Sequence, residues 1–250
     1  MLRIVRPAVA LVVATAIAVV YPKVAAVHDP VAAAPTVPPV VDGVTDIMPL
    51  GDSITGSTGC WRELLWNRLR EAGYDRIDFV GHRAGPECSG SGYDSDSNGF
   101  SGTRVSELAA SGELSEWLQE DYADIVLMHY GSNDIRHGKT LDEILTGLSI
   151  IVEQLRRSNP NVVVLVARII PMTTEPMDKS CPDCPDKVTE LNAAIPGWAA
   201  DHDSIRSPVK VVDQAAGFDP RTDTYDGLHS DDSGGRKIAD AWFTALTQVL

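Results

Sequence analysis

Basic residues are scarce in this chain, which has 21 Lys and Arg against 35 Asp and Glu among 250 residues and a formal net charge of −14 at pH 7. Nucleic acids and anionic membrane surfaces attract proteins through clustered positive charge. The acidity therefore argues against nucleic acid and against a stable membrane partner. It is compatible with a neutral polysaccharide or a small uncharged molecule as ligand.

Long apolar runs are also lacking. The run from Ala8 to Val20 falls short of the roughly 20 residues that a membrane-spanning helix needs. Arg3 and Arg6 precede this run and the small residues Val24-Ala25-Ala26 follow it, as in a secretory signal peptide. We therefore expect residues 1–26 to be a signal peptide, with an uncleaved membrane anchor as the alternative, and the protein to be secreted into the extracellular space.

The sequence has no internal repeat and no room for a second large domain. Residues 27–45 are rich in Ala, Pro and Val without helical or strand periodicity, which predicts an extended linker. Residues 46–250 then form one domain, because a content of 44% hydrophobic residues suffices for a single sizeable core.

Cysteines are few. In an exported protein the four cysteines predict disulfides, for which three pairings are possible. We favour Cys60 with Cys88 and Cys181 with Cys184. A zinc site and a redox site are the weaker alternatives, because Cys181-x-x-Cys184 has no second Cys or His pair at metal-ligand spacing and no adjoining thioredoxin-like pattern.

One segment is similar to a metal loop. Residues Asp94-Ser95-Asp96-Ser97-Asn98-Gly99 match the first half of a calcium loop. Such a loop has a bidentate Glu at its twelfth position, where this chain has Val105. We therefore expect a solvated surface loop that borders a cleft, and no metal.

Strand and helix patterns alternate over the rest of the chain, which is typical of an α/β fold with a doubly wound sheet. Strands are expected at residues 47–50, 77–80, 125–130, 162–169 and 209–212. Helices are expected at residues 61–72, 104–119, 141–157, 187–200 and 235–250.

Polar residues directly follow two of these strands. Gly51-Asp52-Ser53 comes after the first strand and Gly131-Ser132-Asn133-Asp134 after the third, and ligands of open α/β sheets bind at such strand ends. Ser53 is a candidate nucleophile, which requires a base and donors for an oxyanion. Asn133 could supply one donor from its side chain, and Gly102 another from its backbone. The alternatives are an ordinary turn or helix cap at Ser53 and Asn133, and a flexible loop at Gly102.

Asp226 and His229 stand three residues apart near the C-terminus, so one local turn can present a base and the carboxylate that orients it. The alternative is a solvated loop before the final helix, with Ser230 or Asp231 as the helix cap. Gly-x-Ser-x-Gly, the nucleophile motif of α/β-hydrolases, does not occur.

Four blocks follow one another along the chain: Gly51-Asp52-Ser53, Gly102, Gly131 to Asp134, and Asp226 to His229. In this order they resemble the blocks of the SGNH hydrolases, also called GDSL-type esterases. The resemblance implies Ser53 as nucleophile, His229 as base and Asp226 behind it. It further implies an oxyanion hole made of the N–H groups of Ser53 and Gly102 and the side chain of Asn133. The implied fold is flavodoxin-like, a three-layer α/β/α sandwich around a five-stranded parallel sheet of order 2-1-3-4-5.

Within this superfamily the chain is similar to the family 3 carbohydrate esterases, which are secreted acetyl xylan esterases. The likeness rests on segments spread over residues 46–250: Ile47 to Thr55, Trp61-Arg62, Asp78 to Gly81, Ile169-Ile170-Pro171, Leu191 to Pro196, Asp226 to His229 and Ala239 to Trp242. Ser95 to Ser101 departs from the branch, which has an acidic, His-containing sequence there, and Ser132 stands where Thr is common. These departures affect substrate selection rather than catalysis.

The resemblance implies a serine esterase that forms an acyl-enzyme and needs no cofactor, and we expect it to be a monomer. Its expected substrate is an ester, with an acetylated polysaccharide such as xylan as the leading class and a small acyl ester as the other. Tyr130 and Arg168, at strand ends, could reach the cleft, although Arg168 could equally be a structural ion-pair partner. The alternatives are a lipase or broad-specificity esterase of the same superfamily, and a non-catalytic polysaccharide-binding protein.

Overall fold

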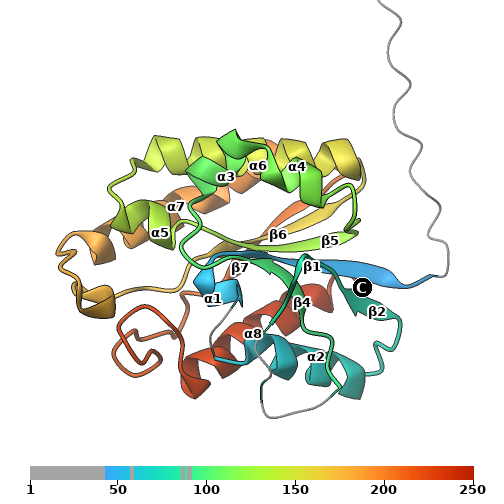
Figure 1. Ribbon diagram of the computed structural model, residues 1–250, viewed down its shortest axis with the longest axis horizontal. Coiled ribbons are helices and arrows are strands. Elements are labelled where there is room, and N and C mark those ends of the chain that lie inside the picture. Colours follow the sequence, from blue (N-terminus) through green and yellow to red (C-terminus); the bar gives the residue numbers. More distant parts are fainter. Residues whose placement is uncertain (1–42, 57–58, 86–87, 89–91) are drawn as a thin grey trace, which may run out of the picture. The chain divides into compact units, whose positions relative to one another are not determined.

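The computed structural model describes residues 43–56, 59–85, 88 and 92–250, all of which belong to the unit Val37–Leu250. A mostly parallel sheet runs through this unit and carries helices on both faces (Figure 1). The expected signal peptide and nearly all of the expected linker lie outside the described residues. Thr45, which we assigned to the linker, is the first residue of strand β1.

The five expected strands are all present and parallel, in the order β2-β1-β5-β6-β7. Their bounds are β1 (Thr45–Gly51), β2 (Ile77–Phe79), β5 (Ile125–His129), β6 (Val163–Arg168) and β7 (Val209–Asp213). Every residue of β5 is buried, as expected for a central parallel strand covered on both faces. The order is the 2-1-3-4-5 arrangement that the family resemblance implies.

Two further short strands lie where we expected a loop. β4 (Asp96–Gly99) continues the edge of β1 and pairs with it in parallel at Leu50 and Gly51. β3 (Arg83–Ala84) pairs antiparallel with β4. The prediction of a solvated loop at residues 94–99 is therefore wrong.

The polar composition of β4 explains why its sequence does not read as a strand. Asn98 is fully buried, and its side-chain oxygen accepts the backbone N–H of His82 at 2.9 Å. The Asp94 carboxylate, just before the strand, likewise accepts the backbone N–H groups of Phe79 and Asp96. Side chains that satisfy neighbouring backbone groups replace the apolar alternation that normally marks a strand.

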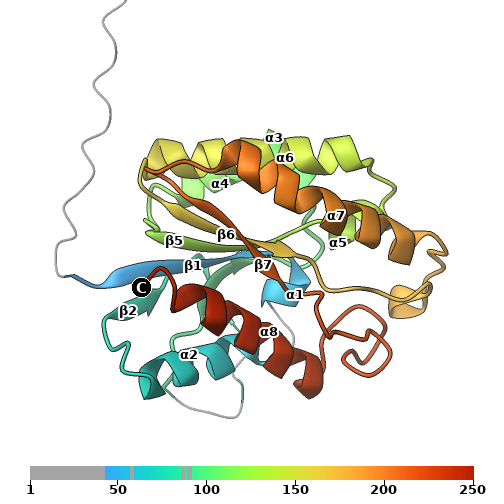
Figure 2. The same ribbon diagram turned by 180° about the vertical axis from the view of Figure 1, so that it is seen from behind.

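The helices form two layers. Those on one face of the sheet are α3 (Val105–Ser111), α4 (Glu113–Trp117), α5 (Ser132–Arg136), α6 (Leu141–Ser158) and α7 (Cys184–His202). The other face carries α2 (Trp61–Glu71) and α8 (Asp232–Leu246); Figure 2 shows α7 and α8 on opposite sides of the sheet. The three-layer α/β/α fold is thereby confirmed.

One expected helix is divided. The pattern over residues 104–119 predicts a single helix, but α3 and α4 are separated by Gly112, whose φ is +82°. A left-handed residue ends an α-helix, and glycine adopts this conformation without steric cost. The apolar periodicity continues across the break, because Leu108 and Leu114 are both buried in the same core.

The long helices carry strong local signals. Thr140 and Glu143 form a capping box at the start of α6. Asp231 caps α8 and is one of the two cap residues, Ser230 or Asp231, that the sequence predicts. Buried Ile and Leu side chains line the inner face of α6, and each contributes roughly 1.5–3 kcal/mol to stability when fully buried.

Two disulfides are present, with the pairing favoured from the sequence. Cys60–Cys88 connects the start of α2 to the segment after β3, and Cys181–Cys184 closes the turn that leads into α7. Among the described residues, no helix combines the length and apolarity required to cross a membrane.

Candidate active site

Ser53, His229 and Asp226 lie within hydrogen-bond reach of one another in a single chain of contacts. Ser53 Oγ is 2.8 Å from His229 Nε2, and His229 Nδ1 is 2.7 Å from Asp226 Oδ2. Ser53 and His229 are both buried, with 8% and 7% of their surface exposed. Residues separated by 176 positions in the sequence therefore meet at the carboxyl edge of the sheet.

The environment of Asp226 favours its ionised form. Burial opposes ionisation, but hydrogen bonds from the His229 backbone and ring and from the Leu228 N–H outweigh it and hold the pKa of Asp226 below its ordinary value. A carboxylate only accepts hydrogen bonds, so His229 Nδ1 carries the proton at this contact. His229 Nε2 is then free to accept the hydrogen of the Ser53 hydroxyl.

The turn that carries Asp226 and His229 is fixed by bonds from its backbone to its own side chains. Gly227 has a φ of +79°, and its N–H donates to Thr224 Oγ1 at 2.8 Å. Asp226 Oδ1 accepts the N–H of His229 at 2.7 Å. Any Cβ at Gly227 would come within 2.1 Å of Thr173 Oγ1, so both the conformation and the space require glycine.

A second loop braces this turn from outside. The N–H of Thr173 donates to Gly227 O at 2.9 Å, and the N–H of Met177 donates to Asp226 O at 2.8 Å. The chain between Thr173 and the Cys181–Cys184 disulfide thus lies against the turn that positions the imidazole.

Ser53 begins the short helix α1 (Ser53–Gly56), directly after β1. Asp52 Oδ1 accepts the N–H of Ile54 at 2.9 Å, so the Gly-Asp-Ser sequence also forms the helix-start turn that we gave as the alternative. The absence of a side chain at Gly51 serves close packing, because a Cβ there would lie 2.1 Å from Thr55 Oγ1 and 2.7 Å from the backbone oxygen of His129.

Asn133 adjoins Ser53 through Asp52. Its side-chain Nδ2 donates to Asp52 Oδ2 at 3.2 Å and to the backbone oxygen of Thr103 at 3.3 Å. Both bonds are long. The amide therefore lies between the Ser53 turn and the loop that contains Gly102.

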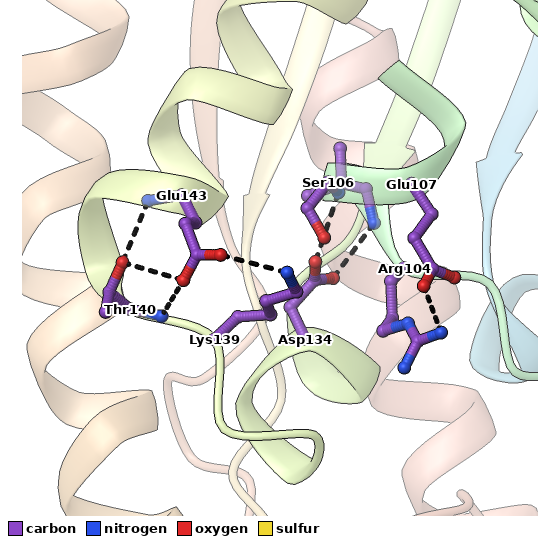
Figure 3. A network of polar contacts seen from close by, with 8 residues as sticks. Arg104, Ser106, Glu107, Asp134, Lys139, Thr140 and Glu143 are labelled. Carbon is purple, nitrogen blue, oxygen red and sulfur yellow. Dashed lines mark hydrogen bonds and ion pairs between the residues drawn. The ribbon is translucent and has the colours of Figure 1, made fainter. Parts of the chain in front are cut away.

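Asp134, in α5, is bonded to the start of α3, as Figure 3 shows. The carboxylate is fully buried and accepts the N–H groups of Val105 at 2.9 Å and Ser106 at 3.1 Å, the first residues of α3. A carboxylate at a helix start satisfies donors that have no partner within the helix. Asp134 thereby fixes the start of α3 three residues after Gly102.

The position of Gly102 is open on the side where a Cβ would stand. No described heavy atom lies within 4 Å of that position, and the φ of Gly102 is +82°. The loop from Phe100 to Thr103 is held at its base, where the N–H of Phe100 donates to Gly51 O at 3.0 Å.

Two buried titratable groups flank the site. Burial raises the pKa of Asp52 to about 7, and the nearby Asp134 adds to this, although the Ile54 N–H lowers it in part. Burial lowers the pKa of His129 to about 4, so this histidine is neutral at pH 7, and its Nε2 accepts the N–H of Ile170 at 3.3 Å. His129 is therefore a core histidine.

Arg168 and Tyr130, which we expected could reach the cleft, take structural positions. Arg168 donates to Asp213 at 2.6 Å and to Asn192 O at 3.0 Å, which is the structural role given as its alternative. Tyr130 is 2% exposed and belongs to the core.

Cys60, Glu63 and Cys88 place possible ligand atoms within 4.8 Å of one another, but the two sulfurs are joined in a disulfide and supply no thiolate.

Three residues acquire positions that the sequence alone did not assign. Asp52 holds Asn133, Asp134 holds the start of α3, and the Tyr225 ring stacks on His229 with centroids 5.8 Å apart. The only signal in the sequence was position, because Asp52 and Asp134 belong to the quoted motif blocks and Tyr225 directly precedes Asp226.

Solved structures of esterases are similar to this chain. One is a family 3 carbohydrate esterase from Talaromyces cellulolyticus, with 33% identity, a TM-score of 0.75 and coverage of 82% of this chain and 98% of that one. Another is an acetyl esterase with a serine-to-alanine substitution, solved with an acetate ion, with 33% identity, a TM-score of 0.74 and the same coverage.

Similarity also extends to longer proteins and to a family profile. A multidomain esterase of Ruminococcus flavefaciens is 27% identical over 229 residues. The chain spans only part of the curated relatives it matches, 56% of one and 29% of the multidomain esterase. The profile of the GDSL-like lipase/acylhydrolase family matches residues 50–237. Because this match includes both Ser53 and His229 and most of the described domain, the chain belongs to the GDSL-like lipase/acylhydrolase family.

Proposed function

We propose that this chain is a secreted serine esterase that removes acetyl groups from carbohydrate. The observation that carries the proposal is the continuous hydrogen-bonded chain from Ser53 through His229 to Asp226. An activated serine needs a base within reach and a group that orients that base. The chain contains both contacts.

In the first half of the reaction, Ser53 Oγ attacks the ester carbonyl while His229 Nε2 takes the hydroxyl proton. The tetrahedral intermediate collapses when His229 returns this proton to the leaving alkoxide, which departs as the alcohol and leaves Ser53 acylated. A water molecule then attacks the acyl-enzyme with His229 again as base, and the free acid departs. Asp226 keeps Nδ1 protonated and stabilises the imidazolium in both halves.

Negative charge on the intermediate requires donors on the side opposite His229. The N–H groups of Ser53 and Gly102 and the amide of Asn133 take this role. Since both bonds of the Asn133 amide are long, one of its hydrogens can turn toward the oxyanion. One donor of this kind is worth roughly 3–4 kcal/mol in the transition state.

The acetyl and carbohydrate parts of the proposal are supported by the similar proteins. One of them is an acetyl esterase solved with acetate and another a family 3 carbohydrate esterase, each 33% identical to this chain. Secretion is supported by the two disulfides, which persist in oxidising compartments. Acetylated xylan remains the leading polymer.

The test compares hydrolysis of 4-nitrophenyl acetate, 4-nitrophenyl palmitate and acetylated xylan. We expect wild type to release acetate from the first and third, and Ser53→Ala to lose at least about 1,000-fold in kcat. Ser115→Ala, an exposed serine on α4, is the matched control and keeps wild-type rates. Equal rates for wild type and Ser53→Ala would refute the proposed nucleophile, and a preference for palmitate would replace the acetyl esterase with a lipase.

A further inference from the structure

Tyr225 is an exposed aromatic ring beside the candidate base. Tyr225 has 66% of its surface exposed. Among the exposed large apolar residues of the described part of the chain, it is the one aromatic. An aromatic ring of this size normally gains by burial, so its exposure next to a reactive group needs a reason.

The ring is held in place rather than extended into solvent at random. Its centroid lies 5.8 Å from that of the His229 imidazole, and the two planes differ by 19°. The N–H of Tyr225 donates to His229 O at 3.1 Å, and the flanking residues Thr224 and Ser230 form an antiparallel bridge. The backbone bonds keep the two residues together and the stacking keeps the rings side by side, with much of Tyr225 left exposed.

The chemistry of the ester determines which part of a substrate meets this ring. His229 returns its proton to the oxygen of the departing alcohol, so the alcohol part of the ester lies on the His229 side of Ser53. The carbonyl oxygen lies on the opposite side, toward Asn133 and Gly102. A ring stacked on His229 is therefore a neighbour of the alcohol and not of the acyl group.

We propose that the exposed face of Tyr225 is a stacking platform for the sugar ring that carries the scissile acetyl ester. The inference rests on the proposed esterase function of Ser53. A pyranose presents a flat face of C–H groups, and an aromatic face is complementary to it, while the phenol hydroxyl can bond to a sugar hydroxyl. Because the ring already stacks on His229, it loses less freedom on binding than an unconstrained side chain would.

A second exposed apolar residue, Met177, adjoins the turn that carries Tyr225 and Asp226. Met177 is 37% exposed, and its N–H donates to the Asp226 oxygen at 2.8 Å. Tyr225 and Met177 are thus two exposed apolar residues that adjoin Asp226, in a chain whose formal net charge is −14. Such a surface suits a neutral sugar better than an anionic ligand.

The kinetic test compares an acetylated xylo-oligosaccharide with ethyl acetate, which has the same acyl group but no ring in its alcohol. The measured quantity is the ratio of kcat/KM for the sugar ester to kcat/KM for ethyl acetate. Tyr225→Ala and Tyr225→Leu lower this ratio by at least about five-fold, whereas Tyr225→Phe keeps it within about two-fold, since only Phe preserves the flat face.

The same assay separates stacking from orientation of His229. If Tyr225 acts only by positioning the imidazole, Tyr225→Ala lowers both rates equally, leaves the ratio unchanged and shifts the pH profile on both esters. That outcome overturns the platform. A ratio for Tyr225→Leu equal to that of wild type also overturns it, because bulk alone would then suffice.

A binding measurement keeps the inference testable without turnover. Ligand-detected NMR of xylotriose with Ser53→Ala gives saturation transfer to the sugar ring protons, and Ser53→Ala/Tyr225→Ala loses most of it. Equal transfer to both variants contradicts the platform. Absence of hydrolysis by wild type together with Tyr225-dependent sugar binding contradicts the esterase function and leaves the platform in place.

Discussion

Asn133 donates its side-chain amide to the carboxylate of Asp52, so the residue before the candidate nucleophile holds a candidate oxyanion donor from the next strand. Asp52 at the same time accepts the N–H of Ile54 at the start of α1. One buried carboxylate therefore couples the position of Ser53 to that of Asn133. The Gly-Asp-Ser motif and the Asn-containing block, which are far apart in sequence, form a single structural unit.

Burial of Asp52 gives the stability of the fold a pH dependence of known sign. Its pKa is about 7 in the fold against an ordinary value of 3.8. Between these values the unfolded chain releases the proton while the folded chain keeps it, so this contribution to the free energy of unfolding falls as pH rises from about 4 to 7.

Asp52→Asn removes this titration. In urea unfolding across that window, the free energy of unfolding of wild type minus that of Asp52→Asn should fall with rising pH, by at most about 4 kcal/mol. Parallel pH profiles for the two proteins would show that Asp52 does not titrate in this way.

Asp134→Asn should lower kcat by about ten-fold with little change in KM, because the start of α3 and hence Gly102 lose one of two bonds to the buried carboxylate. Steady-state kinetics with 4-nitrophenyl acetate measures this. Thr140→Ala is the matched control from the same region (Figure 3), since loss of that helix cap costs about 1 kcal/mol of stability and should leave kcat unchanged. A rise in KM at constant kcat for Asp134→Asn would contradict the positioning role.

Asp226→Asn should lower kcat by at least about 100-fold and up to about 10,000-fold, since the amide would favour the wrong imidazole tautomer. The asparagine oxygen can still accept the N–H groups of Leu228 and His229, so the turn should keep its shape. Asp186→Asn, an exposed residue of α7, is the control for an added amide. A loss below ten-fold would mean that the imidazole is oriented by other groups.

The two disulfides should differ in their contribution to stability. Cys60 and Cys88 are 28 residues apart and Cys181 and Cys184 only 3, and the longer loop restricts the unfolded chain more. Replacing the first pair with serine should cost about 3–4 kcal/mol and replacing the second about 2 kcal/mol. Urea unfolding of the two double variants measures both costs, and the reverse order would contradict this loop-entropy account.

The parts of the fold that can be predicted from the sequence are those that local residue patterns determine. The apolar runs of β1, β5 and β6 and the capping signals of α6 lead directly to strands and helices, and motif residues at strand ends meet because parallel strands place their carboxyl ends at one edge. The pairing of Asp226 with His229 follows from their spacing, which allows one short turn to carry both.

The unpredictable part depends on tertiary contacts of polar residues. β4 has no apolar alternation that would predict a strand. Its Asn98 is buried because the side chain bonds to the His82 backbone, not because it is hydrophobic. The stacking of Tyr225 on His229 depends on the bridge between Thr224 and Ser230, for which the sequence has no separate signal. The division between α3 and α4 has only one signal in the sequence, Gly112. The apolar periodicity on both sides of this glycine favours a single helix instead.

The central claim is that Ser53 is a nucleophile activated by His229. The most direct measurement is covalent labelling with diethyl 4-nitrophenyl phosphate, followed by mass spectrometry of the digested protein. We predict one diethylphosphoryl group on the peptide that contains Ser53, loss of activity in proportion to labelling, and no label on Ser53→Ala or, over the same time, on His229→Ala. An unlabelled Ser53 in an active enzyme, or inactivation by a label on another residue, would contradict the claim.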